Sequence, residues 1–178
     1  MERTKINFLP FPILTTKRLL LRNLKDSDAR EIFFLRSDDS VNKYLDRQKM
    51  KNKDEAKEFI IRITDGIKLN KWIYWAVCLK DNSELIGTIC LWNFSDDKTT
   101  AEIGYELIPS FQAKGLMNEA LRCIINYGFQ TVKLQKIEAY THRENVGSLK
   151  LLEKNNFKLE AIRTDESNAN NIIYSISK

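Results

Sequence analysis

The sequence contains little of what disulfide frameworks, metal centres and flexible linkers require. Its 178 residues include three cysteines, one histidine, three prolines and six glycines. The odd number of cysteines, their wide spacing and the lack of a Cys-x-x-Cys pattern argue against a disulfide framework and indicate reduced thiols in a cytoplasm. A metal site built from nitrogen and sulfur ligands is not expected. The scarcity of proline and glycine argues against long disordered segments.

Long apolar runs are also missing, so no segment reaches the roughly 18–20 residues that a membrane-spanning helix needs. The first residues, "MERTKINFLPFPILTTKR", carry charge early and contain no small-residue cleavage site. They therefore predict no secretion signal. Together these features lead us to expect a cytoplasmic protein that does not enter a membrane.

The charge balance is basic, with 29 Lys and Arg against 24 Asp and Glu, a net charge of +5. This favours anionic partners, including phosphorylated cofactors, without selecting one of them. The densest basic run lies within 43–57, and its alternating charges at 47, 49, 51 and 53 have no aromatic residue between them. We interpret this run as a solvated surface and expect no specific nucleic-acid partner, with an RNA- or ribosome-facing patch as the alternative.

The apolar patterns predict a single α/β domain over residues 1–178, with a core from about 15 to 177. The predicted order is a strand, two helices, a three-strand meander, a helix, a strand, a helix and two strands. The expected strands are 18–24, 72–80, 85–94, 99–109, 136–142, 157–162 and 171–177, and the expected helices are 26–36, 52–63, 115–130 and 146–155. The interior glycines Gly87 and Gly104 indicate a bulge or a close backbone approach in the meander.

The segment 112–118 joins a predicted strand directly to the start of a predicted helix. Unpaired backbone amides and the positive end of the helix dipole meet at such a point, which suits a phosphate. Gly115 lets the backbone approach a ligand closely, and Lys114 adds a positive charge. The same features also describe many ordinary turns. Neither the nucleoside-triphosphate loop G-x-x-x-x-G-K-[ST] nor the dinucleotide loop G-x-G-x-x-G is present, so a phosphate here would belong to another class of ligand.

Four stretches that together cover nearly the whole chain carry a family resemblance. They are residues 13–45, "LIGTICLWNF" (85–94), "AEIGYELIPSFQAKGLMNEAL" (101–121) and "KIEAYTHRENVGSLKLLEKNNFKLE" (136–160). Their combination resembles the GNAT acetyltransferases, and more narrowly the RimJ/RimL-type branch. The resemblance implies a single-domain GNAT fold: a mostly antiparallel sheet with one splayed parallel pair at the cofactor site. It also implies acetyl-CoA as co-substrate and no metal.

The family carries acetyl-CoA on a Q/R-x-x-G-x-G/A loop, which "QAKGLM" matches except at its last position, Met117. We expect the Met117 side chain to point away from the phosphates. The resemblance further places backbone amides of the preceding strand against the thioester, and an asparagine of the N-x-x-S pattern against the pantetheine. The implied cofactor-binding residues are Leu107, Ile108, Gln112, Ala113, Lys114, Gly115, Leu116, Met117, Asn118 and Asn145.

Two catalytic residues are expected on the same grounds. Family analogues place a proton-accepting carboxylate near Glu102, and burial in an apolar cleft would raise its basicity. Glu106 or a water relay are the alternatives. The tyrosine that some relatives use to protonate the leaving thiolate corresponds to Leu152, so Ser148 is the candidate acid. Asn145 equally fits a helix N-cap.

The implied reaction is direct acetyl transfer to a primary amine. An α-amine has a pKa of about 7.7–8.0 and a lysine about 10.4, so a site without a strong base favours a protein or peptide N-terminus. A small-molecule amine, such as a polyamine, an aminoglycoside or an amino-acid-like compound, is the alternative within the enzyme class. An acyl-CoA sensor without catalysis is the alternative outside it. We expect a monomer or homodimer, and pocket walls from the segments 45–55, 93–98 and 163–171.

Overall fold

Eight strands form one sheet in the order β1-β2-β3-β4-β5-β6-β8-β7 in this computed structural model, which describes residues 6–178. The strands are β1 (Leu14–Thr15), β2 (Leu19–Arg22), β3 (Ile73–Leu79), β4 (Leu85–Trp92), β5 (Thr100–Leu107), β6 (Lys136–His142), β7 (Lys158–Leu159) and β8 (Asn171–Ser177). Every neighbouring pair is antiparallel except β5 and β6. The expected mixed, mostly antiparallel α/β fold is confirmed. The first five residues of the expected domain lie outside the described residues.

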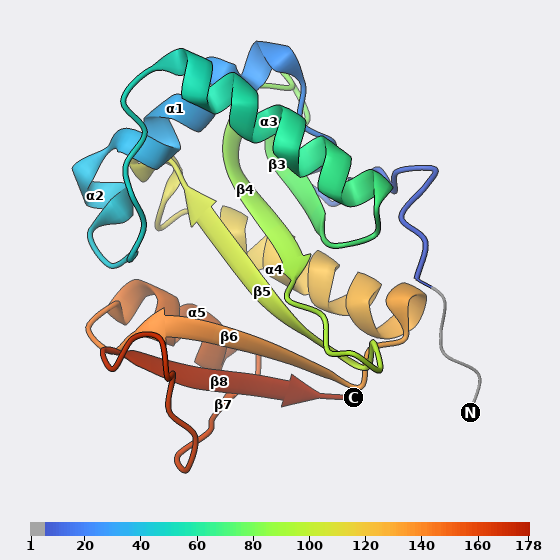
Figure 1. Cartoon of the computed structure of the whole chain (residues 1–178), viewed down its shortest axis with the longest axis vertical. Coiled ribbons are helices and arrows are strands. Elements are labelled where there is room, and N and C mark those ends of the chain that lie inside the picture. Colours follow the sequence, from blue (N-terminus) through green and yellow to red (C-terminus); the bar gives the residue numbers. More distant parts are fainter. Residues whose placement is uncertain (1–5) are drawn as a thin grey trace.

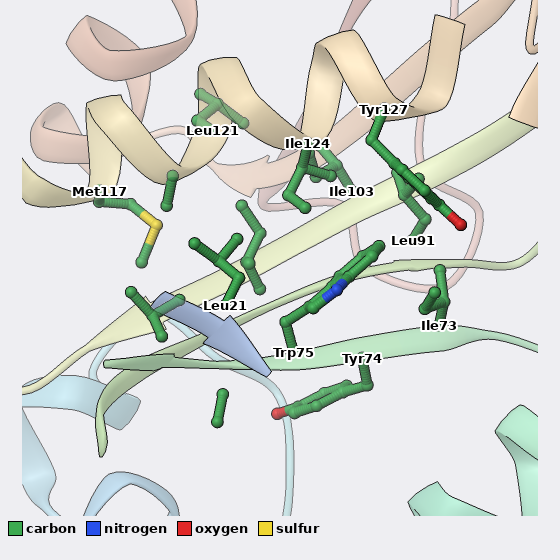
Figure 2. Close-up of a cluster of buried hydrophobic side chains, with 14 of the residues drawn as sticks. Leu21, Ile73, Tyr74, Trp75, Leu91, Ile103, Met117, Leu121, Ile124 and Tyr127 are labelled. Carbon is green, nitrogen blue, oxygen red and sulfur yellow. The ribbon is translucent and has the colours of Figure 1, made fainter. Parts of the chain in front are cut away.

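The helices are α1 (Ala29–Ser37), α2 (Asp39–Asn42), α3 (Lys53–Lys68), α4 (Leu116–Tyr127) and α5 (Val146–Lys154). They cover both faces of the sheet, as two consecutive residues of β3 show. The Trp75 ring packs edge-on against Tyr127 of α4, whereas the Tyr74 ring packs edge-on against Phe59 of α3. Figure 2 shows Trp75 and Tyr74 on opposite sides of the strand, with Met117, Leu121 and Ile124 of α4 above the sheet. Because side chains alternate along a strand, α3 and α4 bury opposite faces of one sheet.

The parallel pair of β5 and β6 is short, and this shapes the site. Only three residue pairs join the strands, the last of them between Glu102 and Glu138. Beyond that pair the two strands diverge, as Figure 1 shows, while β4 continues to pair with β5 and β8 with β6. The edge of β5 that faces β6 is therefore left without a strand partner from about the middle of the strand onward. The expected splayed pair is confirmed.

Gly87 marks an irregularity in the meander, as expected. The pairing register between β3 and β4 shifts by one residue between Val77 and Cys78, which pair with Gly87 and Leu85. A Cβ atom at Gly87 would lie 2.4 Å from the backbone oxygen of Glu106, so any other residue would push β4 away from β5. The bulge and the close approach both occur at this glycine.

Two predicted boundaries are wrong. The helix expected over 52–63 begins at Lys53, capped by the Asn52 side chain as predicted, but continues to Lys68. Gly66 does not end it, because this glycine makes room for a neighbour: a Cβ there would lie 2.1 Å from the Trp72 ring. The strand expected over 157–162 pairs only at β7.

Candidate active site

A cleft of about 1280 Å³ opens where β5 and β6 diverge, and extends beneath α1 and α3. The expected wall segments contribute residues 45–47, 93, 163–168 and 171. Of the predicted site residues, the cleft brings together Glu102, Asn145 and Ser148. The segment 112–118 does not line it and instead lies at the far end of β5 and the start of α4. The predicted site therefore consists of two parts joined by β5.

Glu102 lies on the side of β5 that faces α3, in line with Trp92 of β4, its pairing partner. Burial raises the pKa of Glu102 to about 7, and the only hydrogen bond to its carboxylate within residues 6–178 is a long one of 3.4 Å from Asn93 Nδ2. A carboxylate with this pKa changes its protonation state near neutral pH. It can therefore accept a proton from an amine in the cleft.

Glu106 lies on the same side of β5 but is engaged by other groups. Its Oε2 atom is 2.6 Å from Arg47 Nη2, and its Oε1 atom accepts a hydrogen bond from Thr88 Oγ1. Each of its two carboxylate oxygens thus already accepts a hydrogen bond from the protein. Glu106 is therefore less suited than Glu102 to accept a substrate proton.

The other side of β5 carries a pair of hydroxyl groups. Tyr105 Oη lies 2.8 Å from Ser148 Oγ of α5, and both residues line the cleft. Burial raises the pKa of Tyr105 to about 12, so this phenol stays protonated at neutral pH. Leu152, which stands at the tyrosine position of some relatives, is fully buried. The gap between β5 and β6 thus has Glu102 on one side and the Tyr105–Ser148 pair on the other.

Asn145 caps α5, as its sequence position allowed. Its Oδ1 atom accepts a hydrogen bond of 3.2 Å from the backbone amide of Ser148. The Asn145 Nδ2 group has no hydrogen-bond partner within residues 6–178 and the residue lines the cleft. The cap thus fixes the side chain while leaving a donor available to a ligand.

The segment before α4 presents a row of free backbone amides. Within the described chain, the amides of residues 113–118 donate to no backbone or side-chain acceptor. Ala113 and Gly115 adopt left-handed backbone conformations, with φ of 59° and 74°. Residues 112–115 are exposed. Successive amides in such alternating conformations form a concave site for an anion, and the helix dipole adds to the attraction.

The side chains of this segment leave that concave site open. Leu116 and Met117 are buried, and Figure 2 shows the Met117 side chain directed into the core between α4 and the sheet. The Asn118 side chain accepts a hydrogen bond from Asn155 at the end of α5. Gln112 Nε2 donates to the backbone oxygen of Leu107, which ties the segment to the end of β5. Lys114 is exposed beside the amides.

The backbone amides at the end of β5 face in two directions. The amide of Ile108 donates to Ile86 O at 2.9 Å, so it belongs to the ladder with β4 and does not face the gap. The expectation that this amide faces the thioester is corrected on that ground. Because alternate residues of a strand direct their amides to opposite edges, those of Tyr105 and Leu107 point toward β6.

A cluster of polar contacts fixes the first turn of α4. The carboxylate of Glu119 accepts hydrogen bonds from Thr16 Oγ1 and from the backbone amide of Arg18, and forms an ion pair of 2.8 Å with Arg18 Nε. Arg18 Nη1 also donates to Lys114 O at 3.0 Å. These contacts join the start of β2 to the amide segment and hold the segment in position.

Replacing Glu119 by alanine should lower the free energy of unfolding by about 1–3 kcal/mol, because the Arg18 amide loses its acceptor and the ion pair is lost. Urea unfolding measures this change. Asp54→Ala serves as the control, since it removes an exposed ion pair with Lys57 from the first turn of α3 and should change stability by less than about 1 kcal/mol. Equal effects of the two substitutions would contradict the anchoring role of Glu119.

The sequence did not reveal Tyr105 or the meeting of Arg36, Arg47 and Arg62 in the cleft; of these, only Arg47 falls in an expected wall segment, 45–55, where the pattern of charges indicates a solvated surface. Tyr105 alternates with Glu102 and Glu106 along β5, and so points to the opposite side; only the position of α5 brings it to Ser148. The arginines come from α1, α3 and the segment between α2 and α3. These arginines lie close together only because of how the helices pack, and no local sequence pattern predicts that packing.

Within residues 6–178, no cluster of three or more His, Cys, Asp or Glu side chains could hold a metal ion. No helix in the same residues is long and apolar enough to cross a membrane.

Comparisons with known proteins identify the family of the chain. Residues 18–158 match the family model described as an acetyltransferase (GNAT) domain. The chain is 35% identical over 152 residues to YoaA of Bacillus subtilis, described as an uncharacterised N-acetyltransferase, and this match covers 85% of the chain and 86% of the relative.

Solved structures share the fold at lower identity. The ribosomal-protein-S5-alanine acetyltransferase of Vibrio fischeri superimposes with a TM-score of 0.78 at 22% identity, over 93% of this chain and 96% of that one. RimL, a ribosomal L7/L12 α-N-protein acetyltransferase determined in complex with coenzyme A, gives a TM-score of 0.79 at 17% identity, over 93% and 97%. The resemblance to the RimJ/RimL-type branch therefore extends to the fold. By the family match and by its identity to curated N-acetyltransferases, the chain belongs to the GNAT acetyltransferase family and is an acyltransferase.

Proposed function

We propose that this protein transfers the acetyl group of acetyl-CoA to the α-amine of a protein or peptide N-terminus. The observation that carries the proposal is the gap between β5 and β6, with Glu102 on one side and the Tyr105–Ser148 pair on the other. In this proposal Glu102 accepts a proton from the amine, the hydroxyl pair provides a hydrogen bond to the leaving sulfur, and both line the same gap.

The chain fits acetyl-CoA as co-substrate, which supplies its acetyl group as a reactive thioester. The amides of residues 113–118 are free and suit the pyrophosphate, and their exposure leaves room for the nucleotide. The gap along β5 suits the pantetheine arm, with the Asn145 Nδ2 group as a donor beside it. In this proposal the Leu107 amide donates a hydrogen bond to the oxyanion of the tetrahedral intermediate. The Ile108 amide is not available for this, because it donates to Ile86 O.

The bonds and protons balance with the groups present. The neutral amine attacks the thioester carbon, a C–N bond forms, and the C–S bond breaks. The amine gives one proton to Glu102, and the electron pair of the broken bond stays on sulfur. Because the pKa of Tyr105, about 12, lies above the roughly 8.5 of a thiol, the hydroxyl pair does not give up a proton. It stabilises the thiolate by a hydrogen bond from Ser148. Water then protonates the sulfur, and the proton that Glu102 took from the amine neutralises the resulting hydroxide.

The pKa of Glu102 supports an α-amine as acceptor. At a pKa of about 7, this carboxylate is close to the 7.7–8.0 of an α-amine and well below the 10.4 or so of a lysine. An α-amine is partly neutral at cellular pH and needs only such a weak base. The V. fischeri and RimL structures are both of ribosomal-protein acetyltransferases, which points to the same class of acceptor.

Release of free thiol from acetyl-CoA, followed with a panel of N-terminal peptides and small amines, tests this function. We expect release that depends on an added amine and is fastest with peptides. Faster turnover of polyamines or aminoglycosides would shift the acceptor to small molecules. Binding of acetyl-CoA without amine-dependent release would instead indicate a sensor.

Ser148→Ala should lower kcat about tenfold, because a hydrogen bond to a charged sulfur contributes about 1.5 kcal/mol. Tyr105→Phe should lower kcat less, by about fivefold, since it removes a hydrogen bond between neutral groups. KM for acetyl-CoA should stay near the wild-type value in both. The double variant should be no slower than Ser148→Ala, because the two hydroxyls act as one unit. Additive losses would contradict a shared role.

A further inference from the structure

Three arginines line the part of the cleft beneath α1 and α3. They are Arg36 of α1, Arg47 of the segment between α2 and α3, and Arg62 of α3. Arg47 has partners: it pairs with Glu106 at 2.6 Å, and its guanidinium also donates to Asn42 Oδ1 and Leu35 O. Its charge is therefore matched within the protein.

Arg36 and Arg62 have no such partners. Within residues 6–178 neither guanidinium forms an ion pair or a hydrogen bond, and both lie near the same ring, with Cζ at 4.2 Å and 5.4 Å from the Phe59 centroid. The one other acid on this wall, Asp46, is exposed and forms no ion pair with any of the three arginines in the part of the chain that the structure describes. Two cations thus share one aromatic ring at the cleft wall.

Arg36 is the more unusual of the two, because its Nε atom is buried without an acceptor. Burial lowers the pKa of Arg36, and the nearby charge of Arg47 acts in the same direction, while the carboxylate of Glu106 acts against them. A buried donor without an acceptor is unfavourable, and the Glu106 carboxylate pairs with Arg47 and forms no hydrogen bond to Arg36 within residues 6–178. The two Nη atoms of Arg36 form no hydrogen bond among the described residues and are not buried, and the residue lines the cleft, so a ligand there can reach them.

Acidic side chains line other parts of the cleft. Glu102 lies on β5, and Asp165 and Glu166 line the end formed by residues 163–168 and 171, where Arg163 is paired with Glu138. An acceptor in this cleft therefore meets a carboxylate that attracts its amine and, farther in, two guanidinium groups that attract an anion. Two N–H groups of a planar guanidinium can bond to both oxygens of a carboxylate at once, which favours a carboxylate over an acceptor with one oxygen.

We infer that the acceptor carries a carboxylate as well as its amine, and that Arg36 and Arg62 bind this carboxylate while the amine lies at Glu102. The inference rests on the proposed function and narrows its acceptor class. The carboxylate can belong to an acidic residue near a peptide N-terminus or to a small amino acid, and both present the same chemistry to the arginines.

Matched pairs of acceptors test this. In the peptide pairs, Asp is exchanged for Asn at the first or the second position; in the small-molecule pair, β-alanine is compared with β-alaninamide. With the full chain and saturating acetyl-CoA, the KM of the carboxylate member should be at least about tenfold below that of its amide, as expected for a charge-assisted hydrogen bond. The pair with the larger ratio identifies the source of the carboxylate.

Variants then assign the preference to residues. Arg62→Gln on the exposed side of α3 should reduce the ratio severalfold, and adding Arg36→Gln should bring it near one. Arg30→Gln is the control, because Arg30 is exposed, pairs with Glu31 and does not line the cleft; its ratio should equal that of the wild type. Since Arg36 packs on Phe59 and its loss could impair folding, the single Arg62 variant suffices for the test.

Failure of this inference is distinct from failure of the function. Turnover of amines with no preference for the carboxylate member would overturn the inference and leave the acetyltransferase activity intact. A preference that survives loss of both arginines would overturn it as well. Absence of thiol release with every amine in the panel would instead overturn the proposed function, and the inference with it.

Discussion

Replacing Gly115 by valine is expected to weaken acetyl-CoA binding by 100-fold or more while the protein remains folded. Gly115 has a φ of 74°, which a β-branched residue adopts only at a cost of about 1–2 kcal/mol. Relaxation of this strain would turn the amides of the segment away from the phosphates. The loss of two charge-assisted hydrogen bonds, each worth about 1.5–3 kcal/mol, accounts for the expected change in affinity.

The fold should tolerate this change because the space beside Gly115 is open. A Cβ atom would meet only Arg18 Nη2, at 3.6 Å, which is an ordinary contact. Gly115→Asn is the matched control, since asparagine adopts left-handed conformations more readily and should retain much of the affinity. Calorimetry with acetyl-CoA and thermal unfolding measure the two effects. Unchanged affinity in the valine variant would remove residues 112–118 from cofactor binding.

Glu102→Gln is expected to lower kcat about 10²–10⁴-fold, the usual contribution of a general base. In the wild type, activity requires the ionised carboxylate, so the rate should rise with pH through about 7 and then level off. The variant should lose this rise. A weakly basic amine as acceptor, neutral across the measured range, keeps the acceptor's own titration out of the profile. A variant profile with the wild-type rise would place the base elsewhere.

The same pKa predicts an effect on stability with the opposite sign. Because the folded pKa of Glu102 is raised above its ordinary value of 4.5, the folded state binds a proton that the unfolded state releases between these two values. The wild type should therefore lose stability as the pH rises from about 5 through 7. The Glu102→Gln variant lacks this titrating carboxylate, so its stability should not include this loss. Urea unfolding at pH 5 and pH 8 measures the difference.

Glu106→Gln separates the two carboxylates of β5. Removal of the Glu106 carboxylate leaves Arg47 without its ion pair, so the free energy of unfolding should fall. The rise of the rate with pH should remain, because Glu102 is intact. Loss of the rise in this variant would assign the base to Glu106.

Much of the fold could be predicted from local patterns. The strand at 136–142 and the cap of α5 by Asn145 follow from alternation and from the helix-start signal, and both are as expected. The C-terminal end of α3 could not be predicted. The helix continues through Gly66 because this glycine leaves space for the Trp72 ring, which comes later in the chain. The two-residue strand β1 and the single-turn helix α2 are too short to leave a periodic pattern.

The site divides in the same way. The position of the amide segment follows from a strand that leads into a helix, and Glu102 from a resemblance along β5. The pairing of Tyr105 with Ser148, and the meeting of Arg36 with Arg62 at Phe59, join residues far apart in the chain. Such contacts depend on how α1, α3 and α5 pack on the sheet, which the sequence pattern alone does not specify.

The central claim is that the free backbone amides of residues 113–118 bind acetyl-CoA. Amide NMR during titration with acetyl-CoA tests this claim most directly, because it reports on each backbone amide separately. The largest chemical-shift changes are predicted for residues 113–118 and for Tyr105 and Leu107, with Ile108 affected less because its amide is bound to Ile86. Largest changes in the basic run 43–57, with no response at 113–118, would contradict it.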